Sequence, residues 1–215
     1  MKKVLVILLA VMTLMPLTLS AQSKALNKAL KKQYTEKKKE FKKEGWKLFG
    51  SSRTLDVCLL THYDKLNSLG DEGEEVMGTA TVSSARHKNL LKQAAMTNAC
   101  NNYARNSGSH VKGRVASDMG LTDEEKSEFE HFYAAYEGLV DKEIRGELKE
   151  SFTVIKEVSK DQVDMWVFYI VDVNAATKAR IRAFENAAKE SAVAQKYAEK
   201  VSEFIKEGFE NEVSE

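Results

Sequence analysis

Proline, cysteine and net charge are all scarce in this chain of 215 residues, which has the length of one ordinary domain. The single proline, Pro16, lies near the start, so proline-rich linkers and cis-proline turns are excluded from the rest of the chain. Basic and acidic residues number 33 and 32, so the chain lacks the strong basic bias of a nucleic-acid-binding protein. Hydrophobic residues make up 43% of the sequence, which suffices for a core but not for a protein with several membrane spans.

Long apolar runs are also rare, and the one that stands out covers residues 4–14. Two lysines precede it, and a proline and small residues lead from it to Ala21. This order is typical of a secretory signal peptide, and we expect cleavage after Ala21. The next residue is Gln22, where a bacterial lipoprotein would have a cysteine, so no lipid anchor is expected by that route. The pattern predicts a periplasmic or secreted protein without a transmembrane span in its mature form.

The two cysteines, Cys58 and Cys100, would both remain after this cleavage and would enter an oxidising compartment. They permit one disulfide, but the sequence does not show that they meet. Each lies at the edge of an apolar helical stripe, so two small buried thiols are the alternative. Both interpretations stay open at the level of sequence.

Motifs for metal, nucleotide or covalent chemistry are missing. The chain has no G-x-S-x-G turn and no glycine-rich phosphate loop, and its histidines lack the spacing of metal ligands. We therefore expect no catalytic residue, no metal and no cofactor, and we expect solvated or capping side chains at His62, His87, His110 and His131. The acidic residues between 123 and 130 are interpreted as a helix cap and a solvated face, because a helix N-terminus favours carboxylates.

Periodicity predicts an α+β fold in which a small antiparallel sheet packs on helices, with long helices at both termini. Gly78 and Ala80 would let a helix lie close against the first strand. The segment 163–173 is apolar on both sides, which predicts a central strand. Asp172 or Asn174 would cap one long final helix. The expected helices are 23–44, 51–69, 85–106, 122–142 and 174–208; Ser51 or Ser52 would cap the second, and Thr122 with Glu125 the fourth. Residues 46–49 are expected to form a strand fragment or a hydrophobic plug. The expected strands are 74–83, 110–117, 146–158 and 162–173.

The expected organisation is a signal peptide at 1–21, a lysine-rich helix at 22–45, an α+β domain at 46–173, and a long helix with a tail at 174–215. Residues 22–50 carry ten lysines and three glutamates, whereas residues 185–215 carry eight glutamates and four lysines. We expect the two terminal helices to pack on each other, within a chain or across a homodimer. The alternative is that the lysine face binds anionic lipid head groups or a cell-wall polymer. The pairing would place Leu26, Leu30, Tyr34 and Phe41 against Ala183, Ala187, Ala194, Ala198, Val201 and Ile205.

Three segments carry a resemblance to a known family. They read GTATVSS from Gly78, LLKQAAMTNACNNYARNSG from Leu90, and SFTVIKEVSKDQVDMWVFYIVDVNAATKARI from Ser151. In order and type they resemble the Lpp-twenty-type bacterial envelope lipoproteins and the related N-terminal domain of a flagellar assembly protein, over residues 74–184. The resemblance implies an exported envelope protein with a small antiparallel sheet packed on helices and no established catalytic residues. The chain departs from these lipoproteins because it lacks the lipidated cysteine.

These observations predict an exported, non-enzymatic envelope protein that acts through contacts with an envelope protein or a cell-wall component. One alternative is a periplasmic binding module that holds a small ligand or peptide between the sheet and a helix. The other is an uncharacterised enzyme, since active sites assemble from residues that one sequence cannot juxtapose.

Overall fold

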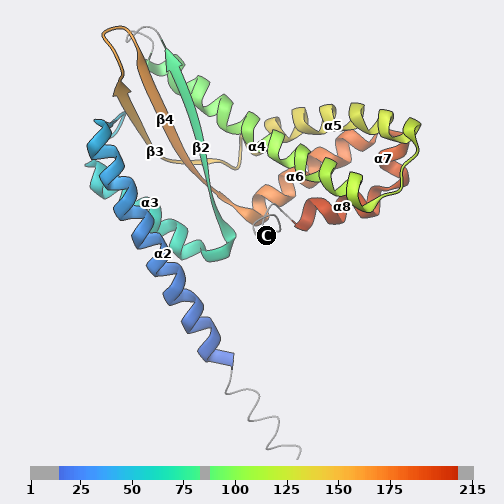
Figure 1. Cartoon of the computed structure of the whole chain (residues 1–215), viewed down its shortest axis with the longest axis horizontal. Helices are drawn as coiled ribbons and strands as arrows, with labels where there is room; N and C mark the ends of the chain where they lie inside the picture. The colour runs from blue at the N-terminus through green and yellow to red at the C-terminus, as the bar shows by residue number, and fades with distance from the viewer. Residues whose placement is uncertain (1–14, 83–87, 208–215) are drawn as a thin grey trace, which may run out of the picture.

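A computed structural model describes the backbone of residues 15–82 and 88–207, with side chains from Asn27 onward. Most of the expected signal peptide, His87 and the last eight residues lie outside the described residues. The expected α+β class is confirmed (Figure 1). The elements are α2 (Met15–Glu44), β1 (Lys47–Leu48), α3 (Leu55–Leu69), the 3-10 turn η1 (Gly70–Glu72), β2 (Gly73–Val82), α4 (Lys88–Asp118), α5 (Asp123–Ile144), β3 (Lys149–Glu157), β4 (Val163–Asp172), α6 (Val173–Ala188), α7 (Ala192–Lys196) and α8 (Ala198–Glu207).

The sheet has the strand order β1-β3-β4-β2, and every neighbouring pair is antiparallel. The expected central strand is confirmed, because β4 pairs with β3 on one side and with β2 on the other. Consecutive residues of β4 are buried on opposite faces, as Val167 and Phe168 show. Residues 46–49 contribute the short edge strand β1, which pairs with β3.

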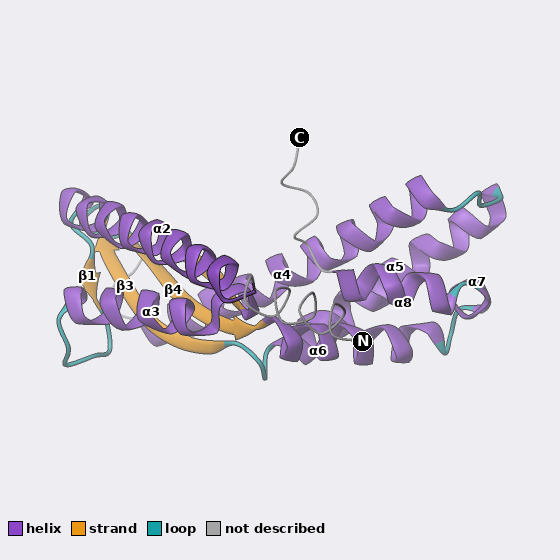
Figure 2. Cartoon of the chain, turned by 90° about the horizontal axis from the view of Figure 1, so that it is seen from below, coloured by secondary structure: helices purple, strands orange, loops and turns teal. Residues whose placement is uncertain are grey.

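Helices cover the sheet on both faces (Figure 2). On one face lie α2 and α3, which close an aromatic cluster around Phe41, Trp46 and Leu59. In this cluster Phe152 and Phe168 stack with ring centroids 4.5 Å apart. The first half of α4 lies on the other face, and the second half continues into a bundle with α5, α6 and α8 (Figure 1). The helix α4 therefore packs against the sheet with its first half and against the bundle helices with its second half.

The close approach of α4 to the sheet depends on Gly78, as expected from its lack of a side chain. A Cβ atom at this position would collide with the carbonyl oxygen of Ala95 and lie 2.9 Å from the Cβ of Ala99. Both alanines are fully buried. Asn98 donates a 2.8 Å hydrogen bond to the carbonyl of Thr79 on the same strand. The small residues of β2 and α4 thus set the distance between these two layers.

The expected end of this helix at residues 106–108 and the expected strand at 110–117 are wrong, since α4 continues unbroken to Asp118. Gly108 does not end the helix; it provides room for Glu137 of α5, which a Cβ at this position would overlap. Ser107 and Tyr136 share a buried hydrogen bond of 2.7 Å between their hydroxyl oxygens. Val111 and Val115 are buried four residues apart, a spacing that suits a helix face.

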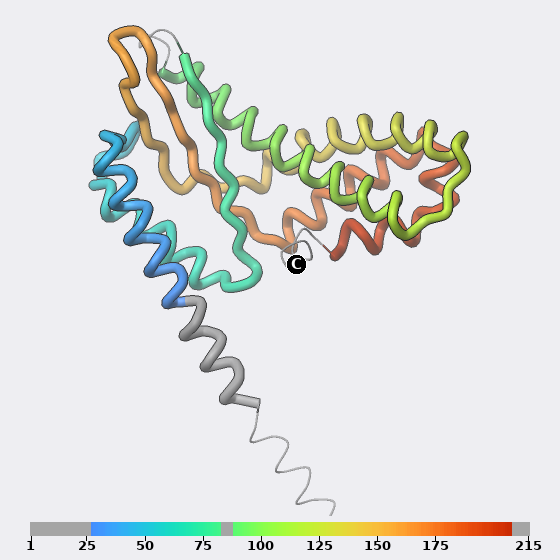
Figure 3. The backbone as a smooth tube through the Cα atoms, in the orientation of Figure 1, coloured from blue at the N-terminus to red at the C-terminus, as the bar shows by residue number. Residues whose placement is uncertain are grey.

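The single long C-terminal helix is also wrong. Asp172 caps α6 as expected, accepting a 2.8 Å hydrogen bond from the amide of Ala175, but the chain breaks twice to form α6, α7 and α8 (Figure 3). Ser191 caps α7, and the Glu128 carboxylate of α5 accepts hydrogen bonds from the Ser191 hydroxyl and from the amide of Val193. The break is therefore held by a partner that is distant in sequence, and it allows α8 to fold back onto α4 and α6.

The expected packing of the terminal helices within one chain is wrong as well. The apolar side of α2 packs on α3 and the sheet, whereas α8 packs on the bundle at the other end of the molecule (Figures 1 and 2). Val201 and Ile205, the C-terminal part of the expected seam, are fully buried in the bundle core. A homodimer through these helices would need other surfaces and remains a separate prediction.

The N-terminal caps of α3 and α5 can be compared with the expected ones. The helix α3 is capped by Thr54, whose hydroxyl accepts from the amide of Val57, and not by Ser51 or Ser52. The expected start of α5 is confirmed, because Thr122 and Glu125 form a reciprocal capping box. Among the described residues, no helix is long and apolar enough to cross a membrane.

Candidate functional site

His62 of α3 lies against the sheet and joins side chains from two different strands. Its Nδ1 atom is 2.9 Å from the hydroxyl oxygen of Ser151 on β3. Its Nε2 atom is 2.5 Å from a carboxylate oxygen of Glu75 on β2. The imidazole is completely buried, with a side-chain exposure of 0%. The expectation of a solvated or capping histidine is therefore wrong at His62.

When the imidazole of His62 is neutral, its two partners set its tautomer. An ionised carboxylate can only accept, so Nε2 of His62 carries hydrogen and donates to Glu75. In the neutral ring Nδ1 is then the acceptor, and the hydroxyl of Ser151 donates to it. A serine hydroxyl, an imidazole and a carboxylate are the groups that activate serine nucleophiles in unrelated folds, and here the two ring nitrogens are exchanged, with Nδ1 facing the serine and Nε2 the carboxylate. We refer to these three side chains as the Ser–His–Glu relay.

A β-bulge brings Ser151 to the histidine. In the register of β3 with β4, Glu150 pairs with Tyr169 and Phe152 with Phe168, so Ser151 is the extra residue between two regular pairs. Such a bulge disrupts the alternation of side chains and reorients the extra residue. Ser151 can therefore reach the face of the sheet that α2 and α3 cover, on which Phe152 also lies.

Aromatic rings enclose the imidazole of His62. The rings of Tyr63, Phe152 and Phe168 pack edge-on against it, with centroid distances of 5.1, 5.4 and 6.2 Å. Burial raises the pKa of the Tyr63 hydroxyl well above its usual value, and the negative charge of Glu75 raises it further. The rings keep the imidazole in one orientation and away from solvent.

Two surface hollows lie at the ends of the relay. One of about 240 Å³ is lined by Ser151 together with Phe49, Arg53 and Phe152. The other, of about 300 Å³, is lined by Glu75 and by residues of α2 and α3. Ser151 is partly exposed, whereas His62 is not. A molecule in the first hollow can therefore meet the serine hydroxyl without reaching the histidine.

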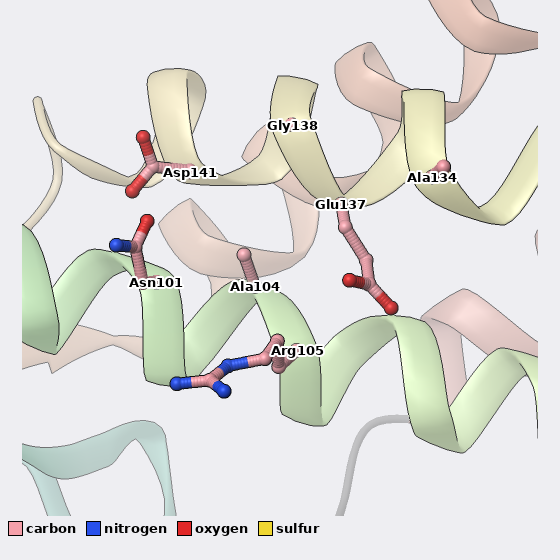
Figure 4. A pocket seen from close by; sticks show the side chains of 7 residues that line it. All are labelled: Asn101, Ala104, Arg105, Ala134, Glu137, Gly138 and Asp141. Carbon is pink, nitrogen blue, oxygen red and sulfur yellow. The ribbon is translucent and has the colours of Figure 1, made fainter.

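A larger pocket of about 540 Å³ lies between α4 and α5 in the bundle. Figure 4 shows Asn101 and Arg105 on α4 opposite Glu137 and Asp141 on α5. Burial raises the pKa of the Glu137 carboxyl. One oxygen of Asp141 is buried and has no hydrogen-bond partner among the described residues, although the same side chain pairs with Arg145 at 3.6 Å. The two carboxylates of this pocket suit a cationic group. Within the described residues, however, no cluster of three or more side chains could hold a metal ion.

The third feature is a groove of about 510 Å³ between α2 and α3. Its walls include Leu30, Tyr34, Leu60 and Tyr63, with Lys28 and Lys31 among the polar lining residues. Leu60 is 51% exposed, which is unusual for a large apolar side chain. The groove therefore combines apolar walls with positive charge.

Only part of the α2 lysine face is neutralised within the described chain. Lys38 pairs with Asp56 of α3 at 2.9 Å. Lys37 pairs with Glu40 at 3.1 Å and lies 5.6 Å from the ring centroid of Trp166. In contrast, the exposed lysines that form no ion pair with another described residue include Lys28, Lys31, Lys39 and Lys43.

The structure does not bring the two cysteines together. Both are free and buried; Cys58 belongs to the cluster under α2 and α3, and Cys100 belongs to the core on the opposite face of the sheet. The disulfide considered from the sequence is therefore not formed, and the alternative of two small buried thiols is confirmed. Burial also raises the pKa of the Cys100 thiol.

The other candidate residues have structural roles or lie on the surface. His110 is buried, with Nε2 3.2 Å from the carbonyl of Phe204, so the expectation of a solvated or capping histidine is wrong there too. His131 is exposed, as expected. In the acidic segment, Glu125 serves in the helix cap as expected, while Glu128 binds the turn before α7.

Ser151 and Glu75 were not recognised from the sequence. They lie 89 and 13 residues from His62, and no local motif links them. The available signal was the position of His62 itself, which continues the apolar stripe of Leu55, Leu59 and Leu66 on α3 and is thereby placed on the buried face. A buried histidine requires hydrogen-bond partners, but the sequence does not name them.

Comparison with known proteins adds no relative: no family model, curated protein or solved structure matches the chain. The resemblance to the Lpp-twenty-type lipoproteins therefore remains a prediction from the sequence. Functional inference depends on the geometry of the chain itself.

Proposed function

We propose that the protein is an exported, non-enzymatic envelope protein that binds anionic phospholipid surfaces through α2 and α3. The observation that carries this proposal is the lysine face of α2, which lies beside an apolar groove and is not covered by residues 185–207, the described part of the acidic C-terminal segment. Lys28 and Lys31 line the groove directly. This role works by contact and requires no chemical turnover.

Charge provides the long-range part of the interaction. Each lysine close to an anionic bilayer surface contributes about 1 kcal/mol, and the effect decays within a Debye length. Lys28 and Lys31 lie one turn apart on α2, so both can face the same surface. Several such lysines give appreciable binding, which salt should weaken.

The groove provides the short-range part. Leu60 on α3, with 51% exposure, and Leu30 on α2 offer apolar area beside the lysines. Burial of apolar area stabilises a complex by roughly 25 cal/mol per Å². Binding should therefore retain a component that high salt does not remove.

Co-sedimentation with vesicles tests this proposal. The mature chain should sediment with vesicles that contain phosphatidylglycerol and stay in solution with pure phosphatidylcholine. Replacing both lysines, Lys28→Glu with Lys31→Glu, should weaken binding by at least about 2 kcal/mol, since two favourable charges are removed and two repulsive ones are added. Leu60→Asp should also weaken binding without lowering the melting temperature, because Leu60 lies on the surface.

The matched control is the pair Lys160→Glu and Lys178→Glu, which makes the same change in charge at exposed positions on the β3–β4 turn and on α6. It should bind like the wild type. Equal loss in both double variants would show that net charge, and not this face, governs the interaction. Binding to neither type of vesicle would contradict the proposal.

A further inference from the structure

The Ser–His–Glu relay is not used by the proposed lipid contact. Ser151 lies on β3 and opens into a different hollow from the groove between α2 and α3. Its hydroxyl oxygen lies 2.9 Å from Nδ1 of His62, whose Nε2 lies 2.5 Å from a carboxylate oxygen of Glu75. We infer that Ser151 is a nucleophile that accepts a short acyl group from an activated ester and becomes an acyl-serine.

The reaction follows from the position of the protons. The Oγ atom of Ser151 attacks the ester carbonyl and forms a new C–O bond, while its proton moves to Nδ1 of His62. The resulting imidazolium is stabilised by the carboxylate of Glu75, 2.5 Å from Nε2. When the original ester C–O bond breaks, the good leaving group departs as its anion, and His62 keeps the proton as an imidazolium beside Glu75. The products are acyl-Ser151, protonated His62 and the leaving anion.

The hollow defines the class of acyl donor. Its volume of about 240 Å³ limits the acyl group to a short one, and its lining is mainly polar, with Phe49 and Phe152 as the aromatic residues. Arg53 lines the same hollow and brings a positive charge to it, beside the negative charge of Glu150. An ester with a good leaving group and a short aliphatic acyl chain fits these properties.

Burial of the histidine predicts that the acyl group stays attached. Hydrolysis of an acyl-serine requires a water molecule that transfers its proton to the same nitrogen of His62. That ring has no solvent exposure and is packed by Tyr63, Phe152 and Phe168. Ser151 is therefore a site of stoichiometric modification, which agrees with a protein that works without turnover.

A purely structural interpretation of the same geometry leads to a different expectation. If the relay only fastened α3 to β2 and β3, Ser151 would react no faster than any other accessible serine. Ser51 is the internal reference, because it lines the same hollow and is exposed but has no hydrogen bond to a histidine among the described residues. The ratio of the two reaction rates within one molecule separates the interpretations.

The full chain is incubated with a fluorophosphonate ester and, separately, with p-nitrophenyl acetate, and the modified peptides are identified by mass spectrometry. A single adduct on Ser151 is expected, formed roughly 100-fold faster than any adduct on Ser51, because general-base assistance is worth about that factor or more. Ser151→Ala should abolish the adduct, and Ser127→Ala, at an exposed serine of α5 outside the hollow, should leave its rate unchanged. His62→Gln should slow labelling about 100-fold.

Glu75 acts through His62 as a positioning residue, and its variants distinguish charge from packing. Glu75→Gln should slow labelling at an unchanged melting temperature, and Glu75→Asp should recover part of the rate by restoring the charge. Comparable labelling of Ser151 and Ser51 in the folded wild-type chain would overturn the inference, and so would the absence of any adduct on Ser151. Both outcomes are measured on the wild-type chain, so they do not depend on whether His62→Gln folds.

Discussion

Replacing glycine by alanine should change the stability of the protein in opposite directions at Gly78 and at Gly113. At Gly78 a Cβ would collide with the backbone oxygen of Ala95, which a rigid helix cannot move away. At Gly113, within α4, a Cβ would meet nothing within 4 Å. Gly78→Ala should destabilise the protein by about 1–3 kcal/mol through overpacking, whereas Gly113→Ala should stabilise it by up to about 1 kcal/mol through helix propensity. Urea denaturation measures both, and equal effects would mean that α4 does not pack on β2 as described.

Sequence patterns predicted those features of the fold that depend on neighbouring residues along the chain. They missed the features that depend on contacts with residues distant in sequence. The small side chains around Gly78 and the capping box at Thr122 were predictable because a close approach and a helix start each leave a local signature. The relay around His62 was not, since its partners come from two strands and one of them is reoriented by a bulge. Periodicity places a side chain on a face and does not say what it meets there.

Errors at the scale of elements have the same origin. Ser107 and Gly108 look like the end of a helix, but contacts with Tyr136 and Glu137 of α5 keep them inside α4. The apolar spacing from 174 onward looks like one helix, yet hydrogen bonds from Ser191 and Val193 to the Glu128 carboxylate stabilise a turn at Ser191. In both cases tertiary contacts override local propensity. The central strand β4 was predictable because burial on both faces leaves a run of apolar residues that needs no distant partner to be recognised.

Glu125 connects two elements of the bundle, and its ionisation should make stability depend on pH. The hydrogen bond from Lys196 of α7 and the bond from the backbone of Thr122 lower the pKa of the Glu125 carboxyl from 4.5 to about 2. A carboxyl whose pKa is lowered in the folded state stabilises the fold above its unfolded pKa, and this contribution disappears as the pH falls through the folded value. The contribution of Glu125 should therefore be complete above pH 4.5 and be lost between pH 4.5 and about 2.

The test compares melting temperatures across this pH range. Glu125→Gln should melt earlier than the wild type at neutral pH, and the two curves should converge toward pH 2. Glu124→Gln is the matched control, because Glu124 is exposed and forms no hydrogen bond or ion pair with another described residue. It should run parallel to the wild type at every pH. A constant difference between Glu125→Gln and the wild type would show that packing, and not charge, links α5 to α7.

At the scale of the whole molecule, two ends carry different surface features. The α2 and α3 face carries the apolar groove, the relay and the lysines that form no ion pair with another described residue, whereas the bundle at the other end carries the pocket between α4 and α5 that Glu137 and Asp141 line. The strands link both ends, since neighbouring residues of β4 enter different cores. This division explains why the opposite charges of the terminal segments need not neutralise each other within a chain.

Export should leave this architecture intact, and the position of the expected cut shows why. Cleavage after Ala21 would remove the first turns of α2, which begins at Met15 in the structure. The side chains that fasten α2 to α3 and the sheet, Leu30, Tyr34 and Phe41, all lie after the cut. Processing should therefore cost the folded domain little stability, and a chain that begins at Gln22 should melt at the same temperature as the unprocessed chain. Intact-mass spectrometry of the protein from its native cells should show a chain that begins at Gln22 and carries no lipid. A native chain that still begins at Met1 would contradict export and, with it, the proposed encounter with an envelope surface.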